Sequence, residues 1–100
     1  MRKLFLIRRV VGGSMLPSLW PGRVVLGWGP ARLRVGDVVI LSHDGLEKIK
    51  RVHRIDGERL YIVGDNADAS TDSRHFGWIH QSQVLARIVW PRASYQQTSA

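Results

Sequence analysis

Residues 47–63 read EKIKRVHRIDGERLYIV, and this stretch decides the fold class. Two segments rich in apolar and β-branched residues flank Asp56-Gly57, and Asp-Gly between such segments is the strongest short-range signal for a β-hairpin. Apolar residues are also spaced as on one face of a helix over 46–55, so a helix there is the alternative. The turn signal favours two antiparallel strands.

Four further segments are typical of strands, because each is a short apolar run close to Gly, Pro or Asp. They are KLFLIRRVV (3–11), RVVLGW (23–28), GDVVILS (36–42) and QVLARIVW (83–90). There is no internal repeat, low-complexity tract or long helical period. The pattern predicts a single all-β domain over residues 1–91, followed by a polar, flexible tail over 92–100.

The composition limits the possible functions. A chain of 100 residues without cysteine forms one modest core and excludes disulfides, thiolate catalysis and cysteine zinc sites. The net charge is +7, with basic clusters in 2–9 and 48–54. Such a charge favours nucleic acid, an anionic membrane surface or an acidic partner, and a solvated basic face explains it equally well.

The N-terminal apolar run, Leu4–Ile7, is four residues long. A signal peptide needs an apolar region of roughly 7–15 residues, and a membrane span needs about 20. We therefore expect a soluble, cytoplasmic protein whose membrane contact is at most peripheral.

Ser14 stands in GGSMLPSLWPG (12–22), behind two glycines and before a methionine. A nucleophilic serine needs a base, and none of the four histidines lies in a triad motif. A buried lysine can replace histidine, because burial disfavours its charged form. Lys50 shares a strand face with Lys48, where a lysine is more often solvent-exposed than catalytic.

A fourteen-residue loop, GDNADASTDSRHFG (64–77), is long for so small a domain. Asp65, Asp68 and Asp72 suggest calcium, but the spacing lacks the glycine and glutamate of an EF-hand loop. His75 and His80 lack an obvious third ligand for zinc. We expect no metal and no cofactor. Turns stabilised by Asn, Asp and Ser side chains explain the composition of the loop, but not its DSRHFG ending.

Taken in order, these segments resemble the type I signal peptidases. GGSMLPSLWPG resembles the nucleophile segment of that family, VGDVVIL its Gly-Asp-Val-Val strand, IKRV the strand of its general base, and GDNADASTDSRHFG its Gly-Asp-Asn…Ser-x-Asp-Ser-Arg segment. Self-cleaving repressors of the LexA type share only a Ser-Met-x-Pro like the first motif. The resemblance covers residues 10 to about 90 and implies a coiled β-sheet catalytic core.

The resemblance assigns catalytic roles to five residues. It implies that Ser14 is the nucleophile and that Lys50 is the general base of a Ser/Lys dyad. Ser70 corresponds to the serine that orients the lysine amine, and Asp72 and Arg74 to the pair that braces the site. Nucleophilic attack on a peptide then gives an acyl-enzyme that water resolves.

Five more residues are implied to support the reaction or to bind substrate. Met15 and Ile49 correspond to residues beside the small P1 side chain, and Pro17 belongs to the same substrate-binding motif. Gly12 and Gly13 let the substrate approach closely and let the amide of the serine face an oxyanion. Some family members have a serine donor where this chain has Gly12, so a second donor must come from elsewhere.

The implied function is the removal of an N-terminal leader or signal peptide from a precursor protein. The chain lacks the family's large insert before the last motif, and it shows no N-terminal span. These departures resemble the short members that mature nickel-type superoxide dismutase, which favours a soluble precursor. The alternatives are a general secretory signal peptidase at the membrane, a non-catalytic peptide binder, and a basic nucleic-acid-binding module that stacks bases on Trp20, Trp28 and Trp78.

Overall fold

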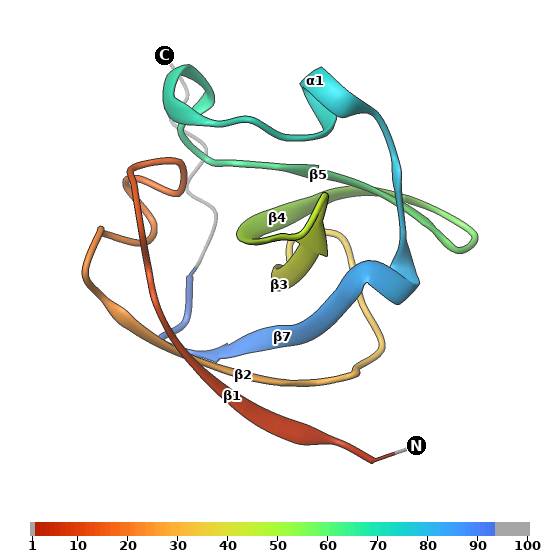
Figure 1. The fold of residues 1–100 in the computed structure, drawn as a ribbon, viewed down its shortest axis with the longest axis horizontal. Coiled ribbons are helices and arrows are strands. Elements are labelled where there is room, and N and C mark those ends of the chain that lie inside the picture. The colour runs from red at the N-terminus through yellow and green to blue at the C-terminus, as the bar shows by residue number, and fades with distance from the viewer. Residues whose placement is uncertain (1, 94–100) are drawn as a thin grey trace.

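The computed structural model describes residues 2–93, and its main feature is one antiparallel sheet of seven strands (Figure 1). The strands pair in the order β1-β2-β7-β3-β4-β5-β6. Their bounds are Leu4–Arg9 (β1), Val24–Gly29 (β2), Val38–His43 (β3), Leu46–Asp56 (β4), Arg59–Val63 (β5), Ile79–His80 (β6) and Val84–Trp90 (β7). The prediction of an all-β fold is confirmed.

The central hairpin forms where the sequence predicts it, so the helical alternative for 46–55 is wrong. The turn itself lies one residue later than predicted, because Asp56 pairs with Arg59 and leaves Gly57 and Glu58 as the loop. Gly57 has a φ of 59°, which only glycine adopts at no cost. A second Asp-Gly turn joins β3 to β4.

The sheet coils so strongly that β1 comes to face β4 (Figure 1). β1 and β4 are separated by three strands in the sheet order, yet Arg8 and Glu47 form an ion pair. Glycine in β2 permits the close packing of β7: a Cβ atom on Gly29 would lie 2.4 Å from the carbonyl oxygen of Leu85. This coil brings the two halves of the candidate site together.

Two apolar clusters fill the interior. The larger lies between β3, β4, β5 and β7; its buried members are Val39, Leu41, Val52, Leu60, Ile62, Ile79 and Val84. The smaller packs the turn after β1 against the sheet, with Val10, Met15, Leu19, Val25 and Val38. Ala93 packs against the smaller cluster, and most of the predicted tail, 94–100, lies outside the described residues.

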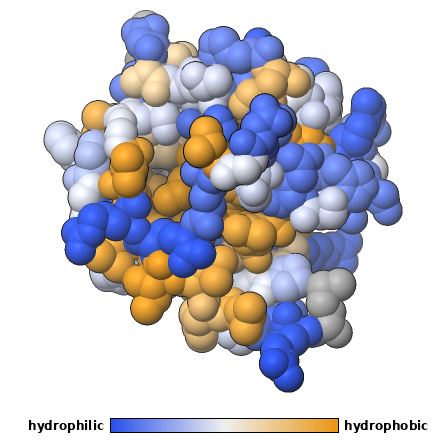
Figure 2. Space-filling view, in the orientation of Figure 1, coloured by the Kyte–Doolittle hydropathy of each residue, from blue (hydrophilic) through white to orange (hydrophobic). Residues whose placement is uncertain are grey.

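The tryptophans lie outside these clusters. Trp20, Trp78 and Trp90 are exposed, and Trp28 packs beside Phe5 on the outer side of β1 and β2. Figure 2 shows many apolar side chains at the surface, gathered near the centre of the face and on the side of β1 and β2. Within residues 2–93, no helix is long and apolar enough to cross a membrane.

The segment 64–77 is more ordered than a plain loop. It contains a 3₁₀ turn, Ala67–Ala69 (η1), and a single helical turn, Ser73–Phe76 (α1). Asp72 caps α1 by accepting a hydrogen bond from the amide of Arg74 at 3.1 Å. A further 3₁₀ turn, Gln81–Gln83 (η2), precedes β7.

Candidate active site

A cavity of about 460 Å³ opens between the turn after β1 and strand β4. Ser14 lines it from the turn, and Lys50 lines it from the middle of β4. Ala69 and Thr71, from the segment 64–77, close another side. The structure thus brings together the serine and the lysine that are 36 positions apart in the sequence.

Lys50 is 5% exposed, so the alternative of a solvated lysine does not hold. Its Nζ donates a hydrogen bond to Ser70 Oγ at 3.1 Å. Burial lowers the pKa of the amine; the charge of Asp72 opposes this shift, and those of Lys48 and Arg74 add to it. A lysine in such a setting yields the neutral amine, the form that accepts a proton, at a lower pH than an exposed one.

Asp72 fixes the serine that holds the lysine. It is fully buried, and its Oδ2 accepts hydrogen bonds from Ser70 Oγ at 2.5 Å and from the Gly64 amide at 2.8 Å. Arg74 donates to both carboxylate oxygens, at 2.9 and 2.6 Å. Burial alone would raise the pKa of Asp72, but these hydrogen bonds outweigh it and hold the pKa well below its usual range.

The direction of these hydrogen bonds determines what Ser70 can do. Because Ser70 gives its hydroxyl proton to Asp72, its oxygen remains free to accept from Lys50. That acceptor fixes the position of the amine, which is the role that the family resemblance implies for Ser70. Ser73, the middle residue of the DSR sequence, accepts a hydrogen bond from the Ile62 amide at 2.9 Å and ties the same turn to β5.

The segment 64–77 also holds the backbone on both sides of Ser14, which the sequence analysis missed. Asn66 donates from its amide to the Ser14 carbonyl at 2.8 Å and from its side chain to the Gly13 carbonyl at 3.0 Å. Gly64 makes this approach possible, since a Cβ atom there would lie 2.3 Å from Ser70 Oγ and 2.6 Å from the carbonyl oxygen of Ser14. The Gly-Asp-Asn motif was the available signal.

Arg51 and Asp65 form a second buried ion pair that sequence reasoning did not assign. Two hydrogen bonds of 2.8 Å join them, and Ser18 donates to Asp65 at 2.5 Å. The pair connects β4, the segment 64–77 and the turn that carries Ser14. Asp65 and Asp72 are thus each neutralised by an arginine, and residues 2–93 contain no group of three or more potential metal ligands.

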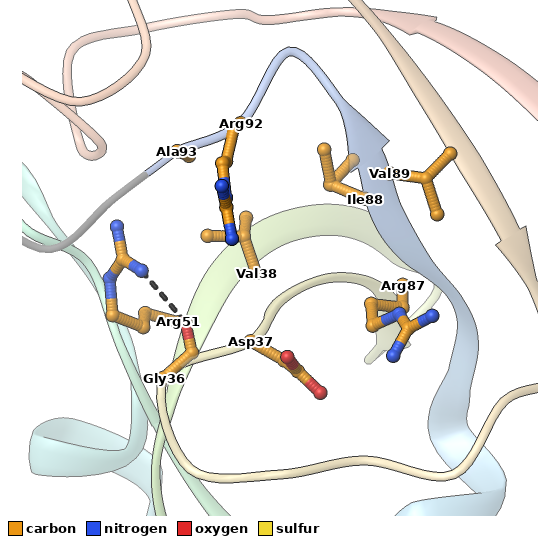
Figure 3. Close-up of a pocket in the computed structure, with 9 residues that line it drawn as sticks. All are labelled: Gly36, Asp37, Val38, Arg51, Arg87, Ile88, Val89, Arg92 and Ala93. Carbon is orange, nitrogen blue, oxygen red and sulfur yellow. Dashed lines mark hydrogen bonds between the residues drawn. The ribbon is translucent and has the colours of Figure 1, made fainter.

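A larger cavity, about 650 Å³, is lined by Arg51 and by residues of β7 and the segment after it (Figure 3). Arg51 donates to the Gly36 carbonyl there at 2.8 Å, beside Arg87 and Arg92. This basic cavity and the one that contains Lys50 share no lining residue. None of the three tryptophans of the nucleic-acid alternative lines it.

Most of the remaining predicted residues surround the smaller cavity. Gly12, Gly13, Met15 and Ile49 line it. Gly12 has a φ of 75°, so a side chain at this position would be strained. Pro17 is exposed in the turn and does not line the cavity.

Comparison with known proteins decides the family. The model of signal peptidase, peptidase S26, matches residues 42–92. The mitochondrial ATP-independent inner membrane protease subunit 1a of Arabidopsis thaliana is 32% identical over an alignment 115 positions long, which includes 82% of this chain and 68% of that protein. The chain belongs to the S26 signal peptidase family. As an S26 member it is a peptidase of precursor proteins. The range matched by the family model contains Lys50 and the segment 64–77, and Ser14 lies before it.

Proposed function

We propose that this S26 peptidase is a serine endopeptidase in which Ser14 is the nucleophile and Lys50 the general base, and that it removes an N-terminal leader from a precursor protein. One observation carries the proposal: Lys50 is buried in the cavity that Ser14 lines, with its amine fixed by Ser70. A desolvated lysine amine that opens onto the same cavity as a serine can serve as its base where no histidine is available.

In this mechanism Ser14 Oγ attacks the scissile carbonyl while its proton passes to the neutral amine of Lys50. The negative charge that develops on the carbonyl oxygen needs a preorganised donor. The Ser14 amide suits this role, because it has no hydrogen-bond acceptor among residues 2–93. Collapse of the intermediate expels the new amine with the proton from Lys50 and leaves an acyl-enzyme. A water molecule then gives a proton to Lys50 and attacks the ester; collapse of this second intermediate releases the leader as a carboxylic acid, and the proton passes from Lys50 back to Ser14 Oγ.

The finer part of the proposal is the substrate. A hairpin with a two-residue loop, Gly57-Glu58, stands where larger family members have an insert, as in the short members that mature nickel-type superoxide dismutase. We propose that the substrate is a soluble precursor with a short N-terminal leader, as in the maturation of nickel-type superoxide dismutase. The competing substrate is a membrane-bound secretory preprotein.

The first test uses Ser14→Ala. Wild type and variant are incubated with proteome-derived peptides, and the new N-termini are sequenced. The variant should lose more than about 10³-fold of the cleavage rate and keep its melting temperature, because only one hydroxyl is removed from a turn. Ser42→Ala, which removes an exposed hydroxyl outside the cavity, is the control that should still cleave. Cleavage by Ser14→Ala at the wild-type rate would end the serine-protease proposal.

The second test separates the two substrates. A precursor of nickel-type superoxide dismutase and a secretory preprotein in anionic lipid vesicles are offered together to the wild type. Cleavage of the first alone supports the soluble-leader proposal. Cleavage of the second alone leaves the Ser/Lys mechanism standing and transfers the chain to secretory processing.

A further inference from the structure

An ion pair joins the two walls of the cavity that contains Ser14 and Lys50. Arg8, on β1, donates from Nε and Nη2 to the two carboxylate oxygens of Glu47 on β4, the latter at 3.3 Å. Both residues line the cavity. Each side chain is 38% exposed, so the pair lies at the solvent side of the cavity rather than in its floor.

The charge of these walls is unbalanced. Besides Lys50, the lining cations are Arg8, Arg9 and Lys48, whereas Glu47 is the one lining carboxylate. Arg9 donates to the Gly22 carbonyl, and Lys48 Nζ lies 5.4 Å from the centre of the Phe76 ring. Neither forms an ion pair within residues 2–93. The cavity therefore has excess positive charge available to a ligand.

The ion pair can be exchanged at little cost. A half-exposed pair contributes little to stability, since water screens both charges. A carboxylate on a bound peptide can therefore replace Glu47 as the partner of Arg8. The loss of one exposed pair is then offset by the gain of an equivalent one.

The spacing along β4 brings Lys48 near the same ligand. Lys48 and Lys50 are on one face of the strand, and alternate residues of a strand are about 7 Å apart. A peptide lying extended in the cavity has the same repeat. If its scissile bond faces Lys50, a side chain about two residues away faces Lys48.

From this placement we propose that the cavity selects precursors with an aspartate or glutamate within three residues of the scissile bond, and that Arg8 and Lys48 bind this carboxylate. The inference rests on the proposed function, because it specifies the substrate of the same site. It adds a charge requirement to the small side chain that Met15 and Ile49 are implied to accept.

Two substitutions break the same ion pair with opposite consequences for an acidic substrate. Arg8→Gln removes a cation and leaves Glu47 free to repel the substrate. Glu47→Gln leaves Arg8 free to bind it. Any effect of losing the ion pair itself is common to both variants. Lys48→Gln removes the second cation, and Lys3→Gln removes an exposed cation that does not line the cavity.

The experiment compares matched synthetic peptides that carry Glu or Gln at each of the three positions on either side of a cleaved bond. The bond is taken from the new termini found with wild type. At 50 mM NaCl we expect kcat/KM for the best Glu peptide to exceed that for its Gln partner roughly 3- to 10-fold. The ratio should fall toward one in Arg8→Gln and Lys48→Gln, rise in Glu47→Gln, and stay unchanged in Lys3→Gln. At 500 mM NaCl it should shrink in wild type because salt screens exposed charges.

The outcomes separate this inference from the proposed function. If wild type cleaves peptides and Ser14→Ala does not, but the Glu/Gln ratio is near one at every position, the charge selection is wrong and the peptidase proposal stands. A ratio that changes in the same direction in Arg8→Gln and Glu47→Gln also overturns the inference, since the ion pair would then matter only as a brace. The absence of new termini with wild type overturns the proposed function and this inference with it.

Discussion

The segment 12–22 and the segment 64–77 meet at the candidate site, but different forces hold them. Met15 and Leu19 fix the first by burying apolar side chains in the smaller core cluster. Buried Asp72 fixes the second by accepting hydrogen bonds from Ser70, Arg74 and the Gly64 amide. The turn of the nucleophile thus combines apolar packing with polar contacts from Asp65 and Asn66, whereas the support of the base depends on one buried carboxylate.

This difference predicts different responses to acid. The pKa of Asp72 is well below its ordinary value of 3.8, so the carboxylate contributes stability that is present above that value and is lost as the pH falls through the folded-state pKa. Burial of Met15 involves no proton. Acid should therefore weaken the hydrogen bonds that support Lys50 and leave the packing of Met15 unchanged.

Asp72→Ala should cost about 3–5 kcal/mol of unfolding free energy, because it removes the partner of Arg74 and leaves the Gly64 amide and Ser70 without their acceptor. Urea unfolding at pH 7 measures the loss. Asp68→Ala is the matched control, since that carboxylate is exposed in the same segment. Equal urea midpoints for Asp72→Ala and Asp68→Ala would remove the structural role of the buried carboxylate. The difference between wild type and Asp72→Ala should shrink as the pH falls below about 4.

Met15→Ala should cost about 2–3 kcal/mol, because it leaves a cavity beneath the turn that carries Ser14. Met15→Leu keeps most of the volume and should cost less than about 1.5 kcal/mol. The loss should be the same at pH 4 and pH 7, as no charge is involved. A loss that falls in acid, as for Asp72→Ala, would mean that the two segments are held by one coupled network.

The sequence predicted the strands well, because apolar alternation and Asp-Gly turns are local signals. It predicted the hairpin of β4 and β5 to within one residue. The coil of the sheet was not predicted from the residues, because it depends on contacts such as Gly29 against Leu85 that are far apart in the chain. It was expected only through the family resemblance.

The site was predictable where a motif carried it, and it was missed where backbone geometry carried it. Ser14, Lys50 and Ser70 were named from motifs, and the structure brings them to one place. The roles of Gly64 and Asn66 depend on carbonyl groups of residues about fifty positions away. Side-chain chemistry alone does not predict such contacts, although both residues stand in the Gly-Asp-Asn motif. The ion pair of Arg51 and Asp65 was missed because Asp65 was considered only as a possible calcium ligand.

Asn66→Ala tests the connection between the two segments and should cost about 1 kcal/mol, the usual contribution of one hydrogen bond. Its backbone bond to Ser14 remains, so the loss is confined to the side-chain bond with Gly13. We expect kcat to fall about 10-fold with little change in KM, because the position of the serine is affected and not the substrate contacts. Gln83→Ala is the control: it removes side-chain bonds to the Ser42 carbonyl at 3.2 Å and from the His80 amide at 2.9 Å, on another part of the sheet. Loss of turnover in both variants would mean that general destabilisation causes it.

Lys50→Met should have the smallest effect on stability, and the sign should be positive. Burial lowers the pKa of Lys50, so at pH values below the folded-state pKa the wild type bears the cost of burying a charged amine, and methionine does not. As the pH rises through the folded-state pKa, the amine loses its proton in the folded protein and this cost declines. It is gone above the ordinary value of 10.5, where the unfolded chain is also neutral.

The melting temperature of Lys50→Met should therefore exceed that of wild type at pH 6, and the difference should shrink steadily toward pH 10.5. Lys3→Met, which removes an exposed lysine, controls for the loss of charge alone. The same range should show peptide cleavage by wild type rising with pH while Lys50→Met remains inactive, because only the neutral amine accepts the proton of Ser14. A stabilisation of Lys50→Met that stays constant from pH 6 to pH 10.5 would mean that packing, and not the buried charge, distinguishes the two proteins.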